Sequence, residues 1–134
     1  MKRIAINGMG RIGRAALKIA IESPDIAVVA VNDVIPIDTL AYLLRHDSVY
    51  GRYSRAIRAE QQTLTVGDRE IRYTSIKDPA ELPWEDVSVD VALECTGIFT
   101  TADLLGKHLQ AGARSAILSA PDKSDTMPTV VPGV

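Results

Sequence analysis

The sequence predicts an α/β protein with a doubly wound, mostly parallel sheet and an antiparallel hairpin at the sheet edge. Three observations lead to this class. Short apolar runs alternate with segments of helical periodicity, a glycine-rich turn follows the first run, and a Gly-Asp pair separates two short runs in the middle of the chain. Strands alternating with helices favour right-handed crossovers. We expect a single domain over residues 1–134, because a chain of this length can bury one hydrophobic core.

The first strand and the first helix are predicted around the glycine-rich turn. Lys2–Asn7 is a short apolar run that ends at this turn. Arg11–Glu22 places apolar residues at the spacing of one helix face, which predicts a helix buried along that face. The residues expected on the buried face are Ile12, Ala15, Ala16, Ile19 and Ala20.

A second strand and a second helix follow. Ile26–Asn32 is an almost unbroken run of β-branched residues and alanine. Continuous hydrophobicity of this kind is typical of a parallel strand that is covered on both faces. A short helix is then predicted from the helical spacing of the apolar residues Ile37, Leu40, Ala41 and Leu44.

The middle of the chain predicts a β-hairpin. Thr63–Val66 and residues 70–73 flank Gly67 and Asp68, and glycine readily supplies the positive φ that a tight turn needs. A two-residue loop would place Leu64 opposite Ile71 on the same face. We expect this hairpin to be antiparallel and to lie at the edge of the sheet.

The last third returns to strands and helices. Residues 89–94 and 114–120 read as buried strands, and residues 101–111 between them read as a helix. Gly112 is the expected residue just after the end of that helix. A final short strand is predicted at residues 129–131.

Composition and charge exclude several classes of function. Fifteen basic and seventeen acidic residues give a net charge of −2, so no basic surplus points to nucleic acid. The apolar runs are too short to cross a bilayer, and no secretion signal is evident. Cys95 is the single cysteine, which excludes an internal disulfide or a cysteine-bound metal cluster. We expect a cytoplasmic location, no membrane partner and no metal site, with His46 and His108 solvated or capping rather than ligating.

The glycine-rich turn is the first feature that points to a ligand. Gly8, Gly10 and Gly13 follow a strand and open a helix, as a loop that holds a pyrophosphate requires. The helix N-terminus offers free N–H groups and a partial positive charge to phosphate. Asp33 stands at the end of the second strand, where it could accept hydrogen bonds from a ribose and repel a 2′-phosphate. The alternative is a bare turn beside an exposed acid. The motif in this setting predicts a Rossmann-type dinucleotide-binding domain.

Several blocks of sequence, taken together, resemble a known family. They are residues 6–14 (INGMGRIGR), 31–33 (VND), 43–48 (LLRHDS) with Gly51–Arg52, 94–100 (ECTGIFT) and 119–121 (SAP). From Lys2 to the last residue, the chain resembles the N-terminal, NAD-binding portion of phosphorylating glyceraldehyde-3-phosphate dehydrogenase. The resemblance implies NAD as the cofactor.

The resemblance implies a role for particular residues around the pyrophosphate and the adenosine. Asn7, Arg11 and Ile12 match the loop around the pyrophosphate. Asp33 matches the residue on the adenosine ribose, where an acid implies NAD rather than NADP. Lys77 matches a basic position that lines the adenine pocket.

The same resemblance assigns the remaining cofactor positions. Thr96 and Gly97 match the turn after the fourth strand, Phe99 would wall the adenine side, and Ser119 matches a serine beside the nicotinamide ribose. Two positions depart from the family pattern: Cys95 stands where the family usually has serine, and Pro132 replaces a larger side chain. The first change should leave the loop intact, whereas the second would affect docking of another domain more than cofactor binding.

The resemblance also implies an activity for the complete enzyme. There, glyceraldehyde 3-phosphate and phosphate are the partners, a cysteine and a histidine beyond residue 134 carry out the chemistry, and the enzyme acts in glycolysis as a homo-oligomer, a tetramer in the family. The catalytic domain is then absent from this chain, which we expect to be inactive alone. Erythrose-4-phosphate dehydrogenase and a stand-alone, non-catalytic NAD-binding module are the alternatives.

Four residues have plainer interpretations. Cys95 could be a nucleophile, but it ends a predicted buried strand, so an inert thiol is favoured. Arg11 could be only a surface residue, although its place at the mouth of the phosphate loop favours a functional role. Trp84 is expected to fill the core rather than to recognise a ligand. Lys77 could lie in a simple turn.

Overall fold

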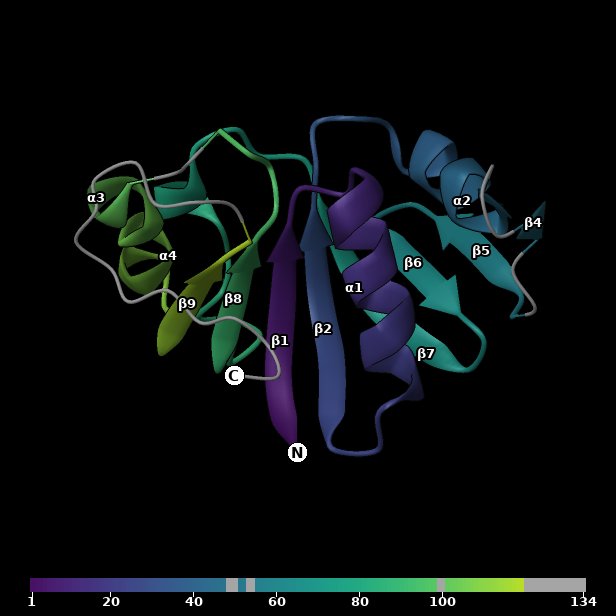
Figure 1. Cartoon of the computed structure of the whole chain (residues 1–134), viewed down its shortest axis with the longest axis horizontal. Helices are drawn as coiled ribbons and strands as arrows, with labels where there is room; N and C mark the ends of the chain where they lie inside the picture. Colours follow the sequence, from purple (N-terminus) through teal and green to yellow (C-terminus); the bar gives the residue numbers. More distant parts are fainter. Residues whose placement is uncertain (48–50, 53–54, 99–100, 120–134) are drawn as a thin grey trace, which may run out of the picture.

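A seven-stranded sheet in the order β5-β6-β7-β2-β1-β8-β9 forms the centre of the computed structural model, which describes residues 1–47, 51–52, 55–98 and 101–119 (Figure 1). Five strands are parallel. They are β1 (Lys2–Asn7), β2 (Ile26–Asn32), β7 (Arg69–Thr74), β8 (Val91–Glu94) and β9 (Ser115–Leu118). The antiparallel side adds β5 (Ile57–Glu60) and β6 (Thr63–Val66). Short strands β3 (His46–Asp47) and β4 (Gly51–Arg52) pair separately.

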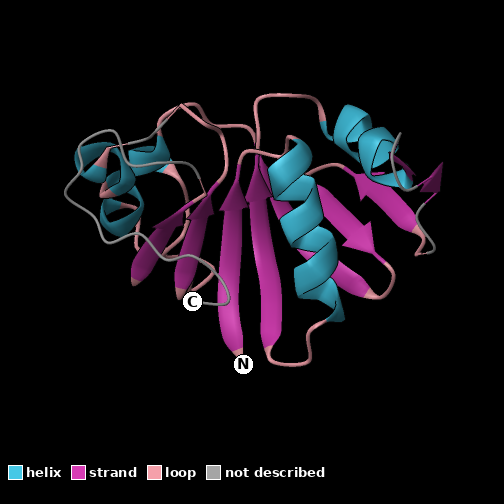
Figure 2. Ribbon diagram, viewed as in Figure 1, coloured by secondary structure: helices cyan, strands magenta, loops and turns pink. Residues whose placement is uncertain are grey.

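Apolar side chains cover both faces of the sheet, which confirms the doubly wound α/β class. Along β1, Ile4 and Ile6 join a core with helices α1 (Arg11–Glu22) and α2 (Ile37–Arg45). Ala5 points to the opposite face. There it joins a smaller core with Trp84 and with Ala111, which follows α4 (Lys107–Gln110). Figure 2 shows α1 across the middle of the sheet, α2 near the β5 side, and the helices of residues 102–110 near the β9 side. Two further short helices are η1 (Pro79–Glu81) and α3 (Ala102–Leu105).

The predicted buried face of α1 is wrong in part, although the helix itself has the predicted bounds: Ala20 is buried and Ala16 packs against the core, but Ile12, Ala15 and Ile19 are exposed. Ile12 and Ile19 are 57% and 74% exposed. The buried residues of α1 are Gly13, Leu17, Ala20 and Ile21. A Cβ atom added at Gly13 would lie 1.9 Å from the carbonyl oxygen of Gly8, so the helix must turn Gly13 towards the loop. Residues four, seven and eight positions further on then share the buried face.

The predicted hairpin is confirmed, and Leu64 pairs with Ile71 as expected. Gly67 in its turn has a φ of +63°. The hairpin does not itself form the sheet edge, however, because β5 pairs with β6 on the outer side and β7 pairs with the parallel strand β2. The antiparallel part therefore runs over three strands, β5, β6 and β7, and β7 is also parallel to β2.

The predicted helix over residues 101–111 is divided into α3 and α4 at Gly106. Within the second part, the amide of Leu109 donates to Gly106 O, three residues back, so the α-helical pattern is interrupted. Gly112 follows with a φ of +114°, as expected for the residue after a helix. The strand predicted at residues 129–131 lies outside the described residues, as do Phe99 and Pro132. No helix in the described ranges is long and apolar enough to span a membrane.

Candidate dinucleotide-binding site

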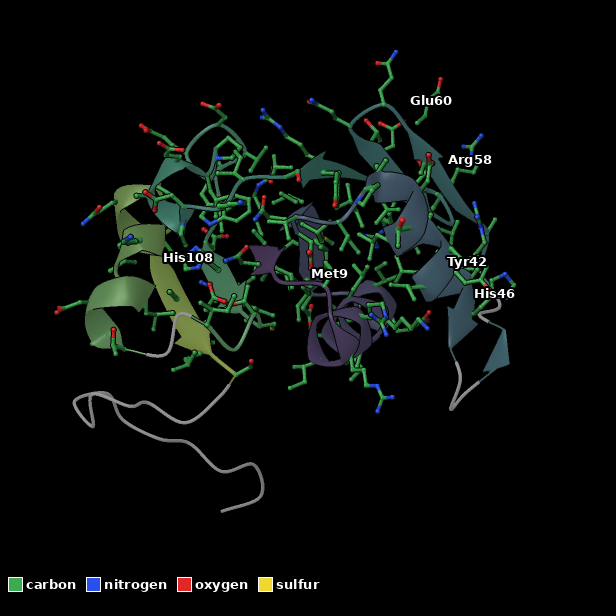
Figure 3. The ribbon with its side chains drawn as sticks, turned by 90° about the horizontal axis from the view of Figure 1, so that it is seen from above. Met9, Tyr42, His46, Arg58, Glu60 and His108 are labelled. Atoms are coloured by element: carbon green, nitrogen blue, oxygen red, sulfur yellow. The ribbon has the colours of Figure 1, made fainter. Side chains whose placement is uncertain are left out.

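The carboxyl ends of four parallel strands surround a cavity of about 510 Å³. Strands β2 and β8 flank β1 on opposite sides, so the cavity lies where the order of the strands reverses. Open α/β sheets bind ligands in such a crevice. Figure 3 looks down on this end of the sheet, with Met9 of the glycine-rich turn near its centre. The lining residues are Asn7, Gly8, Gly10, Asn32, Asp33, Val34, Ile76, Lys77, Cys95, Thr96 and Ile98.

The three glycines of the turn differ in what requires them. Gly8 has a φ of +94°, and a Cβ there would lie 2.6 Å from the Thr96 amide nitrogen. A Cβ at Gly13 would overlap Gly8 O, so protein packing accounts for both of these glycines. At Gly10 an added Cβ would meet nothing within 4 Å. Packing therefore does not account for Gly10, which leaves open space beside the N-terminus of α1.

The N-terminus of α1 opens at the same place. Gly10 is the N-cap and supplies no side-chain hydrogen bond to the first turn, and that turn contains no acidic residue. Its N–H groups and the positive end of the helix dipole are therefore available to an anion. Arg11 and Ile12 begin the helix with exposed side chains but do not line the cavity.

Asp33 links the second strand to the glycine-rich turn. Its Oδ2 accepts a hydrogen bond from the Met9 amide at 2.6 Å, and its Oδ1 accepts one from the Ile35 amide at 3.2 Å. The Tyr73 hydroxyl donates to the carbonyl of Ile35 and lies 3.2 Å from that of Asp33. Burial, with the charge of Asp33, raises the pKa of Tyr73 to about 12, so this hydroxyl stays a donor at neutral pH. Each carboxylate oxygen of Asp33 retains acceptor capacity for a ligand.

Glu94, at the end of β8, is fully buried beneath the cavity and accepts four hydrogen bonds. Oε1 accepts from Asn7 Nδ2 at 2.7 Å and from His108 Nε2 at 2.8 Å. Oε2 accepts from the amide and the hydroxyl of Thr96, at 2.9 and 2.6 Å. Burial opposes the charge, but the hydrogen bonds from His108, Thr96 and Asn7 outweigh it and hold the pKa of Glu94 below its ordinary value. The buried group is therefore a carboxylate.

The lowered pKa of Glu94 predicts a component of stability that is lost in acid. Because the folded-state pKa lies below the ordinary value of 4.5, ionised Glu94 stabilises the fold above pH 4.5, and this contribution declines as the pH falls further. We expect the difference in free energy of unfolding between the wild type and Glu94→Gln to be larger at pH 5 than at pH 3, measured by chemical denaturation. For the exposed control Glu60→Gln, the free energy of unfolding should change with pH as it does in the wild type, because the substitution leaves Glu94 in place. A wild-type advantage that persists unchanged at pH 3 would contradict the assignment.

The predictions for Trp84, Cys95 and the two histidines can be compared with the structure. Trp84 is fully buried, as predicted. His46 is exposed, but His108 is fully buried, so the prediction that it is solvated or capping is wrong. It bonds Glu94 through Nε2 and accepts from Trp84 Nε1 at 2.9 Å through Nδ1. Cys95 is half-buried, and burial, together with the nearby charge of Glu94, raises the pKa of its thiol, which opposes a role as nucleophile.

The structure brings half of the predicted cofactor residues to one cavity. The residues that line it are Asn7, Gly8, Gly10, Asp33, Lys77 and Thr96. Gly97 follows Thr96 with a φ of +76°, and the Ser119 hydroxyl bonds Glu94 O at 2.9 Å; neither residue lines the cavity. The cofactor contacts of all these residues stay predictions.

Sequence reasoning does not single out four other lining residues. Asn32 and Ile98 lie within the resembling blocks 31–33 and 94–100 but have no role assigned there, and Val34 and Ile76 only adjoin Asp33 and Lys77. Asn32 is buried and bonds Asn7 Oδ1 at 2.8 Å. Asn32 therefore links the turn after β1 to β2.

A second cavity, of about 620 Å³, lies beside the first and shares Val34 and Ile76 with it. It extends past Pro36 and Tyr73 to Gln62, away from the glycine-rich turn. Although it is larger, it is lined by neither the N-terminus of α1 nor Asp33; the N-terminus of α2 lines it instead, with Asp38 in its first turn. The smaller cavity is therefore the candidate site.

Comparisons with known proteins show the family of the chain. The family described as "Glyceraldehyde 3-phosphate dehydrogenase, NAD binding domain" matches residues 2–102. The glyceraldehyde-3-phosphate dehydrogenase of Xanthobacter flavus is 50% identical over 135 residues, covering 98% of this chain. The cytosolic glyceraldehyde-3-phosphate dehydrogenases of Trypanosoma brucei brucei and Leishmania mexicana are 43% and 41% identical, covering 98% and 100% of the chain.

The chain spans about 40% of the length of each of these relatives. The matched family covers well over half of the chain, and it includes the glycine-rich turn, Asp33 and Thr96. The strand order, the cavity at the carboxyl ends and the sequence similarity lead to the same assignment. The chain belongs to the glyceraldehyde-3-phosphate dehydrogenase family and corresponds to its NAD-binding domain.

Proposed function

We propose that the chain binds NAD in the cavity at Gly8, Asp33 and Thr96, as the cofactor-binding part of a phosphorylating glyceraldehyde-3-phosphate dehydrogenase. The observation that carries this proposal is Gly10. It sits at the uncapped N-terminus of α1, and its missing side chain leaves open space that no protein atom needs. A pyrophosphate is the group that such a helix N-terminus accepts best.

Each side of the cavity supports one portion of the cofactor. The turn with Asn7, Gly8, Gly10 and Arg11 supports the pyrophosphate, with Ile12 and Gly13 setting the start of the helix. The Asp33 carboxylate accepts from the adenosine ribose and disfavours a 2′-phosphate, so NAD is preferred to NADP.

The other wall of the site comes from later parts of the chain. Lys77 borders the adenine, Thr96 and Gly97 form the turn beside the cofactor, and Ser119 lies towards the nicotinamide ribose. Phe99, outside the described residues, is assigned to the adenine side by the resemblance alone. When bound, NAD supplies the acceptor for a hydride; these residues bind and orient it.

The complete enzyme would oxidise glyceraldehyde 3-phosphate and phosphorylate the product, in glycolysis, in the cytoplasm and as a homo-oligomer. This part of the proposal rests on the relatives. Erythrose-4-phosphate dehydrogenase, on the same scaffold, and a stand-alone NAD-binding module are the alternatives. A Ser-Cys-Thr-Thr-like segment encoded downstream of Val134 would favour an enzyme, and assays of such a longer protein with both sugar phosphates would separate the two enzymes.

The 134 residues alone should bind NAD without catalysing the reaction. We expect a dissociation constant from about ten micromolar to about a millimolar, because this chain provides only one side of the cofactor site. No activity is expected, since the single cysteine is half-buried with a raised pKa and is not an activated nucleophile. Calorimetric titration with NAD and an NADH absorbance assay with glyceraldehyde 3-phosphate and phosphate measure the two properties. Phosphate-dependent formation of NADH by this chain would overturn the proposal, and so would the absence of NAD binding at millimolar concentration.

A further inference from the structure

We propose that Glu94 is the positioning residue of the dinucleotide site: its buried carboxylate holds the turn after β1, through Asn7, against the turn after β8, through Thr96. Asn7 and Thr96 both line the cavity, whereas Glu94 does not. Glu94 therefore acts on a ligand through these two residues. The inference rests on the proposed NAD site and adds the group that determines its shape.

The donor count around Glu94 requires a carboxylate rather than an amide. Each oxygen faces two donors, Asn7 and His108 at Oε1 and the two groups of Thr96 at Oε2. A glutamine offers one acceptor oxygen and one NH₂ group. With its NH₂ group towards Oε1, glutamine faces the donors of Asn7 and His108; with its NH₂ group towards Oε2, it faces the Thr96 amide, and only the Thr96 hydroxyl can reverse to accept from it. Glu94→Gln is thus nearly isosteric but cannot keep all four hydrogen bonds, so one of the two turns is held less firmly.

Trp84 keeps the second donor at Oε1 in place. An indole N–H can only donate, so its bond to His108 Nδ1 makes that nitrogen the acceptor and assigns the proton of the neutral ring to Nε2. Nε2 then donates to Glu94. The Trp84 and His108 rings lie 6.3 Å apart in a stacked arrangement, and Trp84 belongs to the smaller core, separate from the core that contains α1. Figure 3 labels His108.

The attachment continues to the second strand and beyond. Asn32 Nδ2 donates to Asn7 Oδ1 at 2.8 Å and to Ile76 O at 2.9 Å, while Asn32 Oδ1 accepts from the Ile76 amide and the Thr74 hydroxyl. Glu94, Asn7 and Asn32 therefore connect the ends of β8, β1, β2 and β7 below the cavity. Replacing the carboxylate by an amide removes the acceptor of the Thr96 backbone amide or leaves Asn7 and His108 without theirs.

The test compares the wild type with Glu94→Gln and with the matched control Glu60→Gln, whose exposed carboxylate lies on β5 far from His108 (Figure 3). Calorimetry with NAD should show affinity at least tenfold weaker for Glu94→Gln and unchanged, within twofold, for Glu60→Gln. Hydrogen exchange followed by NMR should show at least tenfold faster exchange in Glu94→Gln, relative to the amide of Leu17 in α1, at the Thr96 amide if the NH₂ group faces Oε2 or at the Trp84 indole N–H if it faces His108. A loss of stability alone would accelerate Thr96 and Leu17 together.

Two results would overturn the proposal. One is a folded Glu94→Gln variant with NAD affinity within twofold of the wild type. The other is a wild-type Thr96 amide that exchanges as fast as an exposed amide, and this measurement decides the question even where the variant does not fold. If the wild type itself fails to bind NAD, the proposed function is lost, while the exchange data still show whether Glu94 holds the two turns together.

Discussion

Gly13→Ala should destabilise the fold by about 1–3 kcal/mol or more, whereas Gly10→Ala should leave the free energy of unfolding within about 0.5 kcal/mol of the wild type. The reason is the space around each position. A Cβ at residue 13 would lie 1.9 Å from Gly8 O, so helix and loop must move apart, while a Cβ at residue 10 meets no protein atom. Chemical denaturation of the two variants without ligand measures the difference directly.

Gly10→Ala, which should hardly change the stability, should nevertheless weaken the binding of NAD. Gly10→Ala is expected to bind NAD at least tenfold more weakly, a loss of about 1.4 kcal/mol or more, because the added methyl group occupies space intended for the pyrophosphate. Calorimetry at a temperature where both variants are folded provides the measurement. Undiminished NAD affinity of Gly10→Ala would mean that the pyrophosphate does not pass this glycine.

Asp33→Ala should weaken NAD binding by about 1.5–3 kcal/mol, or about 10- to 150-fold, through the loss of charge-assisted hydrogen bonds to the ribose. The structure adds a second cause, because the carboxylate also accepts from the Met9 and Ile35 amides. Loosening of the turn should weaken NAD and NADP equally. Loss of the ribose contact weakens NAD binding, and loss of charge repulsion favours NADP, so together they should reduce the difference in affinity between the two cofactors.

Titrating each cofactor into the wild type, Asp33→Ala and Asp33→Asn separates these causes. The side chain of the Asp33→Asn variant would retain an acceptor oxygen for one of the two amides but carry no charge. We expect the ratio of NAD to NADP affinity to fall in both variants and the absolute loss to be larger for alanine. An unchanged ratio in both would show that Asp33 supports the turn without facing the ribose.

Local sequence patterns account for most of the strands and helices. The Gly-Asp turn brings Leu64 opposite Ile71 because a two-residue loop with glycine defines the register. The preceding hairpin, between β5 and β6, has no such signal. Its turn at Gln61 and Gln62 places Gln61 at a φ of +54°, which few residues other than glycine adopt. Tertiary pairing of β5 with β6 outweighs this local preference, so β5 could not be predicted from turn residues.

The rotation of α1 shows a different limit. Ile12 and Ile19 fit an apolar stripe as well as Leu17 and Ile21 do, and periodicity cannot choose between two stripes on one helix. The close approach of Gly13 to Gly8 determines which stripe is buried, and this contact exists only in the folded loop.

The candidate site is predictable only in part for a related reason. The glycine-rich turn and Asp33 come directly after predicted strands, so the sequence indicates them. The hydrogen bonds from His108 and Asn7 to Glu94 instead join residues 14 and 87 positions apart. No local pattern in the sequence identifies Glu94 as a shared acceptor.

The Tyr73 hydroxyl has a consequence for the thermodynamics of ligand binding. It secures the 33–35 segment through the carbonyl of Ile35 before any ligand arrives, and a pKa of about 12 keeps it protonated throughout the range in which carboxylates titrate. The adenosine side of the site is therefore preorganised during folding. A cofactor that binds there does not have to order this segment. The loss of conformational entropy on binding is therefore smaller than it would be for a loose loop.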